Sequence, residues 1–333
     1  MNLEDVAHRA RVSTATVSRV LNDIGLVKST TRARVLKAVK ELNYHPNLHA
    51  RTLASGKNRT LGMVVSNLEN PFFLDIFRAL EAEAHRCGYE VLVVNTDYQP
   101  QRLVAGVHAM MGRRPAGLAV IVSEVKTALI RELSQAGLPV VFYDVGVSGP
   151  NITNIRVNYG KGMQRVVEYL HDLGHRRMAF VGHHTSLGPL SVRKESFVDT
   201  MAGFSPNVEF TTIADEDGPV GGRQAVRRLL ESNFAPTAIL CVNDFMAIGV
   251  LRELRDQGLS VPGDVSVTGF DNIRLAEFTN PALTTVHIPR ERIGELVFEA
   301  LAPEADRPAE PGHDVLIEPA LIVRESTGPC REG

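Results

Sequence analysis

The chain contains no tryptophan and only three cysteines among its 333 residues. Cys87, Cys241 and Cys330 lie far apart and are odd in number, so no pair has metal-ligand or redox spacing. We interpret them as two core thiols and one tail thiol in a reducing compartment. No apolar run approaches the ~18 residues of a membrane span, and the N-terminus lacks the basic start and apolar core of an export signal. We therefore expect a cytoplasmic protein with no membrane partner.

Sequence motifs that would mark an enzyme are also missing. We find no GxGxxG after a predicted strand, no GxxxxGK[ST], no GxSxG and no His/Cys set with metal spacing. The glycine-rich stretch at 218–222 is more typical of a loop that leads into a helix, and His183-His184 of a strand end. We expect no enzyme activity, no cofactor and no metal. A cleft enzyme or a solute-binding protein without a DNA role is the alternative.

Positive charge is scarce outside the first sixty residues. Residues 1–60 hold eleven Lys and Arg against four Asp and Glu, a balance of +7. The whole chain carries −2, so the remaining 273 residues carry −9. A basic head on an acidic body is typical of a nucleic-acid reader joined to a second module.

The basic head has the pattern of a helix-turn-helix. Asn2 is placed to cap a first helix, and Ser13 a second helix whose Val17, Val20 and Leu21 face inward. The second helix of this motif enters the major groove by its N-terminus. Its predicted outward side chains are Thr14, Ala15, Ser18 and Arg19. A third helix is expected from about 30 to 44.

From residue 60 onward, apolar strand-like runs alternate with helical stretches. The predicted strands are 61–66, 90–95, 118–122, 140–145, 178–181, 210–213, 239–242 and 265–270. Such alternation predicts parallel sheets with helices on both faces, and the length predicts two lobes. Ligands of such sheets bind beyond the carboxyl ends of the strands.

Polar and aromatic residues follow these predicted strand ends. They include the stretch 67–73, Asp144, Asp217, Asn243-Asp244 and Asp271-Asn272, while Arg193 is expected on a loop before a helix. Rings beside Asp, Asn and Arg suit a hydroxylated ligand, because apolar faces stack and polar groups bind hydroxyls.

The head resembles that of the LacI/GalR family of bacterial repressors. The matching segments are LEDVA at 3–7, VSTATVSRVLN at 12–22, YHPN at 44–47 and ARTL at 50–53. Arg11 departs from the Gly or Asn that is usual at this turn. The resemblance implies a hinge helix from about 46, whose Leu53 enters the minor groove as an apolar wedge. Pattern and resemblance together assign DNA contact to Thr14, Ala15, Thr16, Ser18, Arg19, Asn22, Arg51 and Leu53.

The resemblance continues through the body, at 173–180, 242–244, 261–267, 269–271 and 281–286. It implies a two-lobed, periplasmic-binding-protein-like module with the effector in the cleft. By this likeness the effector-binding residues are Asn70, Phe72, Phe73, Asp144, Arg193, Asn243 and Asp271. The match is looser around 193–197 and 217–222, which leaves the identity of the effector open. A sugar or sugar derivative is favoured, and a nucleoside or another polar metabolite is the alternative.

The expected architecture is a small all-α helix-turn-helix domain followed by a two-lobed α/β domain with two doubly wound parallel sheets. Residues 1–45 form the DNA-binding domain, and 46–59 the hinge helix and linker. The N-terminal lobe takes 60–157 plus about 288–313, and the C-terminal lobe 158–287 plus about 314–327. Some members of the family carry a tetramer-forming leucine heptad at the C-terminus, and no such heptad follows residue 325. The resemblance therefore implies a homodimer on a near-palindromic, double-stranded operator.

Overall fold

The computed structural model describes residues 1–21, 25, 27–44, 58–123, 125–144, 149–184, 188–302, 312 and 314–331. Two compact units make up the chain, Met1–Asn58 and Arg59–Gly333. Of the helices described, none is long and apolar enough to cross a membrane.

The described part of the first unit contains the helices α1 (Leu3–Ala10), α2 (Thr14–Leu21) and α3 (Ser29–Glu41). The predicted cap of α1 is present as a capping box, in which Asn2 and Asp5 each accept a hydrogen bond from the other's backbone N–H. One apolar stripe from each helix forms the core, where Val6, Val17 and Val35 are fully buried. The helix predicted over 30–44 ends earlier, at Glu41, because Asn43 adopts a positive φ of 45°.

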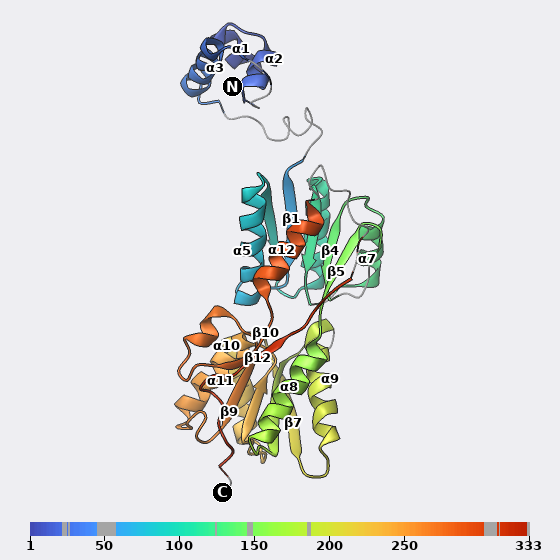
Figure 1. Cartoon of the computed structure of the whole chain (residues 1–333), viewed down its shortest axis with the longest axis vertical. Helices are drawn as coiled ribbons and strands as arrows, with labels where there is room; N and C mark the ends of the chain where they lie inside the picture. Colours follow the sequence, from blue (N-terminus) through green and yellow to red (C-terminus); the bar gives the residue numbers. More distant parts are fainter. Residues whose placement is uncertain are drawn as a thin grey trace. The chain divides into compact units, whose positions relative to one another are not determined.

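The first lobe of the second unit is built on a six-stranded parallel sheet of order β11-β5-β4-β3-β1-β2, of which Figure 1 labels β1, β4 and β5. Its strands are β1 (Thr60–Val65), β2 (Glu90–Asn95), β3 (Gly117–Ile121), β4 (Val140–Tyr143), β5 (Ile152–Val157) and β11 (Asp314–Ile317). Its helices are α5 (Pro71–Arg86), α6 (Pro100–Gly112), α7 (Thr127–Ser134) and α12 (Arg290–Leu301).

The second lobe holds another six-stranded sheet, of order β12-β10-β9-β8-β6-β7. Its strands are β6 (Arg177–His183), β7 (Glu209–Asp215), β8 (Ala238–Cys241), β9 (Ser266–Asp271), β10 (Thr284–His287) and β12 (Ala320–Ile322). Its helices are α8 (Tyr159–Asp172), α9 (Gly188–Gly203), α10 (Pro219–Glu231), α11 (Asp244–Asp256) and the 3-10 helix η1 (Arg274–Glu277). The all-parallel prediction needs one correction, because edge strand β12 runs antiparallel to β10.

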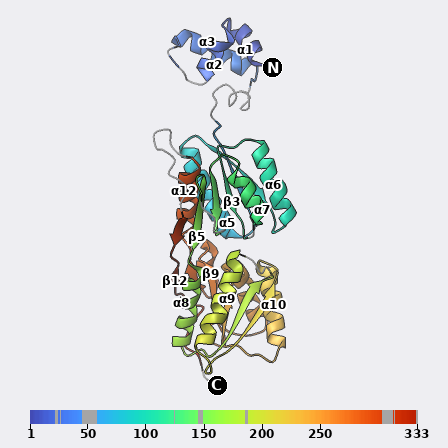
Figure 2. The ribbon, with the colours of Figure 1, turned by 90° about the vertical axis from the view of Figure 1, so that its right-hand side faces the viewer.

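Successive side chains of each strand point to opposite faces of the sheet, and this alternation explains why helices cover both faces of the first sheet (Figure 2). In β1, Leu61 and Met63 pack into the core on the α5 and α12 side, whereas Val64 packs against α6 and α7. Strands that are buried on both faces have continuous apolar sequences, which is the pattern that marked them as strands.

The described residues cross between the lobes three times. The first crossing follows Val157 and the second lies between β10 and α12. The third was expected near Asp314, but Asp314–Ile317 forms β11 and pairs with β5 of the first lobe. The chain therefore returns to the second lobe only at Glu318-Pro319, since β12 pairs with β10. The pairing of β11 with β5, and not an apolar pattern in the sequence, decides where this boundary between the lobes lies.

Candidate functional site: a helix-turn-helix head and an interlobe cleft

Helix α2 presents polar side chains at its N-terminal end. Thr14, Ala15 and Arg19 are exposed, and Thr16 and Ser18 are half-buried. The predicted cap is present, because the Ser13 hydroxyl accepts a hydrogen bond from the Thr16 N–H at 3.3 Å. Asn22, Arg51 and Leu53, the other predicted DNA contacts, lie outside the described residues.

Arg11 supplies the left-handed residue of the turn between α1 and α2. It has φ 54° and ψ 51° and closes α1, while the Val12 N–H donates to the Ala7 carbonyl. A non-glycine residue pays roughly 1 kcal/mol for this conformation, so the departure from the family pattern changes the side chain but keeps the turn. The exposed guanidinium adds a positive charge beside α2.

Six of the seven predicted effector-binding residues line one small cavity between the two lobes. Asn70, Phe72, Phe73, Arg193, Asn243 and Asp271 line it together with residues that include Tyr98, Tyr143 and Tyr159. Two of the six are helix caps, as strand-end polar residues often are. The Asn70 Oδ1 accepts from the Phe72 N–H, and the Asn243 Oδ1 accepts from the Met246 N–H.

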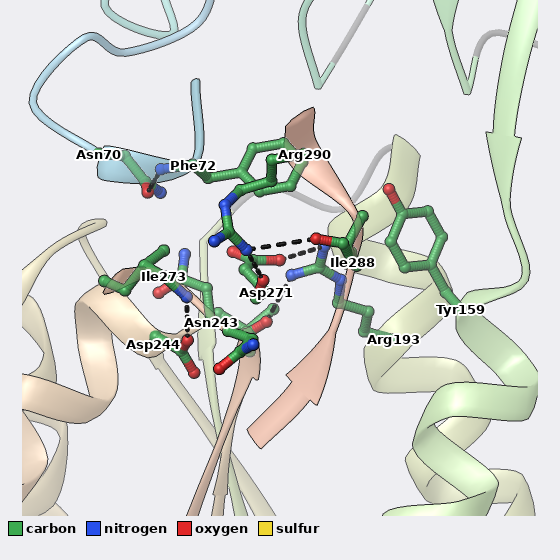
Figure 3. Close-up of polar contacts among 12 residues, drawn as sticks. Asn70, Phe72, Tyr159, Arg193, Asn243, Asp244, Asp271, Ile273, Ile288 and Arg290 are labelled. Atoms are coloured by element: carbon green, nitrogen blue, oxygen red, sulfur yellow. Dashed lines mark hydrogen bonds and ion pairs between the residues drawn. The ribbon is translucent and has the colours of Figure 1, made fainter. Parts of the chain in front are cut away.

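Arg193 and Asp271 form a buried ion pair at the base of this cavity (Figure 3). The Arg193 Nη2 donates to the Asp271 Oδ1 at 3.0 Å, and Nη1 donates to the Val242 carbonyl at 2.6 Å. The guanidinium lies 4.2 Å from the ring centroid of Phe270. Its Nε is buried without a hydrogen-bond partner among the described residues. A buried donor without a partner raises the free energy of the folded state.

Arg193 differs from its predicted location. It lies in the second turn of α9, not on a loop before a helix, because the helix already begins at Gly188-Pro189. Proline suits the first turn of a helix, where a missing N–H has no cost. A helix holds the guanidinium more rigidly than a loop would.

Asp144 lies on the first lobe as expected, but it does not line the cavity. Its Oδ1 accepts from the Val157 N–H at 2.9 Å and its Oδ2 from the Tyr159 hydroxyl at 2.6 Å. Both bonds reach residues that flank the first interlobe crossing. Burial raises the pKa of Asp144 to about 6, against the opposing effect of these donors. Effector contact by Asp144 remains a prediction.

Two further cleft residues stand outside the seven predicted effector-binding residues, although Asp217 was recognised as a polar residue at a strand end. Asp217, which follows β7, accepts hydrogen bonds from the Tyr98 hydroxyl at 2.7 Å and the Asn243 Nδ2 at 2.9 Å. The Asn70 Nδ2 lies 3.5 Å from the same carboxylate. Tyr98 follows β2 by three residues, so the strand-end rule that found the others could have found it too.

Arg290 ties the ion pair to the first lobe. Its Nε donates to the Asp75 Oδ2 at 3.0 Å, and its Nη1 donates to the backbone carbonyl of Asp271. Burial raises the pKa of Asp271 to about 6, and the Arg193 and Arg290 guanidinium groups limit the rise. Buried Asp244 accepts from the Ile273 N–H and the Thr285 hydroxyl and so holds the loop after β9.

A larger cavity of about 600 Å³ adjoins the smaller one, whose volume is about 30 Å³. Its lining includes Glu69, His183 and Asp217, and Tyr98, Val122 and Ser123 line both cavities. Within the described parts of the chain, no group of three or more His, Cys, Asp or Glu is placed to hold a metal ion. The arrangement is therefore that of a polar and aromatic binding cleft between two lobes.

Comparison with known proteins agrees with both halves of this description. Residues 2–47 match the model of "Bacterial regulatory proteins, lacI family", and residues 167–327 that of a "Periplasmic binding protein-like domain". The "HTH-type transcriptional repressor PurR" of Erwinia tasmaniensis is 35% identical over 336 residues, which cover 99% of this chain and 98% of the relative.

Solved structures show the same architecture. A Lac repressor dimer bound to operator and the anti-inducer ONPF superposes with a TM-score of 0.83 at 27% identity, covering 98% of this chain and 99% of that one. A LacI family regulator from Enterococcus faecium with bound ribose has a TM-score of 0.73 at 26% identity, with 82% and 100% covered.

The helix-turn-helix head and the two-lobed body define a ligand-responsive, DNA-binding transcription repressor. The chain belongs to the LacI family of bacterial regulatory proteins. The predicted family and fold class are confirmed, as is the prediction that the chain is a regulator and not an enzyme.

Proposed function

We propose that this repressor binds a near-palindromic operator as a homodimer in the cytoplasm, and that a sugar or sugar derivative bound between the lobes controls it. The observation that carries the effector class is the cleft itself. Asp217, Asn243 and Asn70 supply hydrogen-bonding groups there, while Phe72 and Tyr143 supply ring faces. Sugars are bound by this combination of stacking faces and polar groups, and the related structure with ribose supports the choice.

Two surface features support the homodimer. Leu275 on η1 and Phe278 directly after it are 49% and 79% exposed. Exposed apolar clusters commonly mark protein–protein contacts. A two-fold dimer would present two α2 helices to two half-sites of one operator.

Control by the effector is a shift between two lobe arrangements. A ligand that binds one arrangement more tightly changes its population, and with it the spacing of the two DNA-binding heads. By linkage, operator must change the affinity for the ligand by the same factor. Arg193, Asp271 and Arg290 join the cleft to a crossing segment, and so offer a physical connection for this coupling.

The test begins with thermal unfolding of the full chain against a fixed panel of sugars, polyols, sugar phosphates and nucleosides. A ligand at ~100 times its Kd adds roughly 2.7 kcal/mol of stability. The operator is then selected from random duplex DNA, and its affinity is measured with and without the ligand over a range of salt. A sugar that stabilises the protein and shifts operator affinity supports the proposal. A nucleoside as the sole stabilising ligand, or an unchanged operator affinity at saturation, contradicts it.

A further inference from the structure

The smaller and larger cavities in the cleft, here called the inner and outer chambers, are separated by few side chains. Tyr98, Val122 and Ser123 line both chambers. The inner chamber has a volume of about 30 Å³, which leaves room for water but not for a sugar ring. The outer chamber, about 600 Å³, lies in the range of small-ligand sites. A sugar ring does not fit the inner chamber until a side chain between the chambers moves.

Tyr98 is held by the polar group that a ligand hydroxyl would use. Its hydroxyl donates to the Asp217 Oδ2 at 2.7 Å, across the cleft from its own lobe. Its ring centroid lies 5.1 Å from that of His183, which is also on the second lobe. The aromatic ring and the hydroxyl of Tyr98 thus make the contacts expected of a bound hydroxylated ring.

The backbone that carries Tyr98 is held away from its preferred conformations. Asp97 and Tyr98 have φ values of 55° and 53°, a region that non-glycine residues seldom adopt. Local contacts hold the loop there, since the Tyr98 N–H donates to the Ser66 carbonyl at 3.2 Å. Residues in such backbone regions persist only where the surrounding contacts hold them there.

We propose that Tyr98 is a gate between the chambers, and that the effector opens it by taking its place on Asp217. The proposal rests on the proposed function, because it describes how the effector enters that same cleft. In the closed state Tyr98 joins the two lobes through Asp217 without any ligand. The effector exchanges this tyrosine–carboxylate bond for its own, and the inner ring faces of Phe72 and Tyr143 become available to it.

The outer chamber selects the charge of the effector. Carboxyl groups of Glu69, Asp97, Glu216 and Asp217 line it, and among its described lining residues there is no Lys or Arg. Among the described residues, Asp97 is the one of the four that has an arginine partner, Arg102, at 3.3 Å. A phosphate or carboxylate entering here would meet like charge at short range. These four carboxyl groups outnumber the two imidazoles, of His183 and His184, in the same lining, so we infer that the effector is an uncharged, hydroxyl-bearing compound.

The gate is tested by thiol alkylation in the full chain. The reporter variant is Phe73→Cys, because Phe73 lines the inner chamber and not the outer one. The reaction of this new thiol with iodoacetamide is followed by peptide mass mapping. The rate is measured in Phe73→Cys by itself and in the same variant combined with Tyr98→Phe, with Tyr98→Ala or with the control Tyr89→Phe. Tyr89 packs on Phe298, away from the lining residues of both chambers. Loss of a hydrogen bond to a carboxylate shifts the gate by about tenfold.

We expect Tyr98→Phe to accelerate alkylation of the inner thiol about tenfold and Tyr98→Ala to accelerate it further, while Tyr89→Phe has no effect. Equal rates in all four proteins would overturn the gate. So would acceleration by Tyr98→Ala alone, because the hydroxyl bond to Asp217 would then play no part.

Charge selection is tested at the rim of the outer chamber with Gln99→Cys. The rate ratio of anionic iodoacetate to neutral iodoacetamide is compared between the folded variant and the same variant in urea. A ratio lowered severalfold by folding supports an uncharged effector, and an unchanged or raised ratio overturns that class. Neither alkylation experiment involves DNA. A negative result for the gate can therefore be distinguished from a negative result for operator control, because operator control is measured with the unmodified chain.

Discussion

Replacement of Asp271 by asparagine should reveal how strongly the cleft depends on its buried charge. Arg193 and Asp271 are each 3% exposed, and the carboxylate is the only anionic partner that the described contacts give this guanidinium. Asn keeps the shape of the side chain and tolerates the φ of 106° at this position. The change leaves a buried cation with neutral acceptors, which destabilises a protein by about 3–5 kcal/mol.

The assay is urea and thermal unfolding at neutral pH without ligand. At roughly 2–4 °C per kcal/mol for a unit of this size, Asp271→Asn should lower the Tm by about 10 °C. The double variant Arg193→Met with Asp271→Asn removes the stranded charge and should recover at least half of the loss. As a control, Glu295→Gln breaks the exposed pair with Arg292 and should change stability by less than about 0.5 kcal/mol.

Two results would refute this reasoning. A loss below about 1 kcal/mol for Asp271→Asn would mean that water or another group compensates the guanidinium. A double variant no more stable than Asp271→Asn alone would mean that the loss comes from the loop after β9, and not from the unpaired charge of Arg193.

Three further predictions concern the head, the first crossing and the dimer. Arg19→Ala should reduce discrimination between operator and random DNA by roughly 1–3 kcal/mol. Lys37 is an exposed lysine of α3, so Lys37→Ala should weaken binding to both DNAs equally, as expected of a phosphate contact. Equal losses on both DNAs for Arg19→Ala would remove it as a base reader. Burial raises the pKa of Asp144 to about 6, so its contribution to stability falls as pH rises from about 4 to 6 and is then constant. The free energy of unfolding of the wild type minus that of Asp144→Asn should therefore fall by about 3 kcal/mol over this pH range. Stability curves of the two proteins that stay parallel would contradict this prediction. Phe278→Asp should raise the dimer Kd at least about tenfold in sedimentation, unlike Val104→Asp on α6; an unchanged Kd would place the interface elsewhere.

Much of the architecture could be predicted from local pattern. Buried parallel strands have continuous apolar sequences, so β1, β3 and β8 were recognisable without a partner. Helix caps could be recognised too, because the side chains of Asn2 and Ser13 accept hydrogen bonds from backbone N–H groups only three residues further along the chain. Short edge strands such as β11 and β12 were not recognisable, since pairing with distant strands defines them.

The cleft shows where local reasoning ends. The rule that polar residues follow parallel strands placed Asn70, Asn243 and Asp271 in one site, because the carboxyl ends of parallel strands share an edge. The same rule could not show that both oxygens of Asp144 serve Val157 and Tyr159. Nor could it show that Tyr98 reaches Asp217 on the other lobe.

The sequence by itself determined the basic helix-turn-helix head, the two-lobed α/β body and the membership of a repressor family. These follow from charge, periodicity and ordered motifs, which are properties of neighbouring residues. Only the tertiary structure decided which side chains meet across the cleft, where the third crossing falls and how the cleft divides into chambers. Such contacts join residues more than a hundred positions apart, as Tyr98 and Asp217 do, and their geometry depends on how both lobes pack.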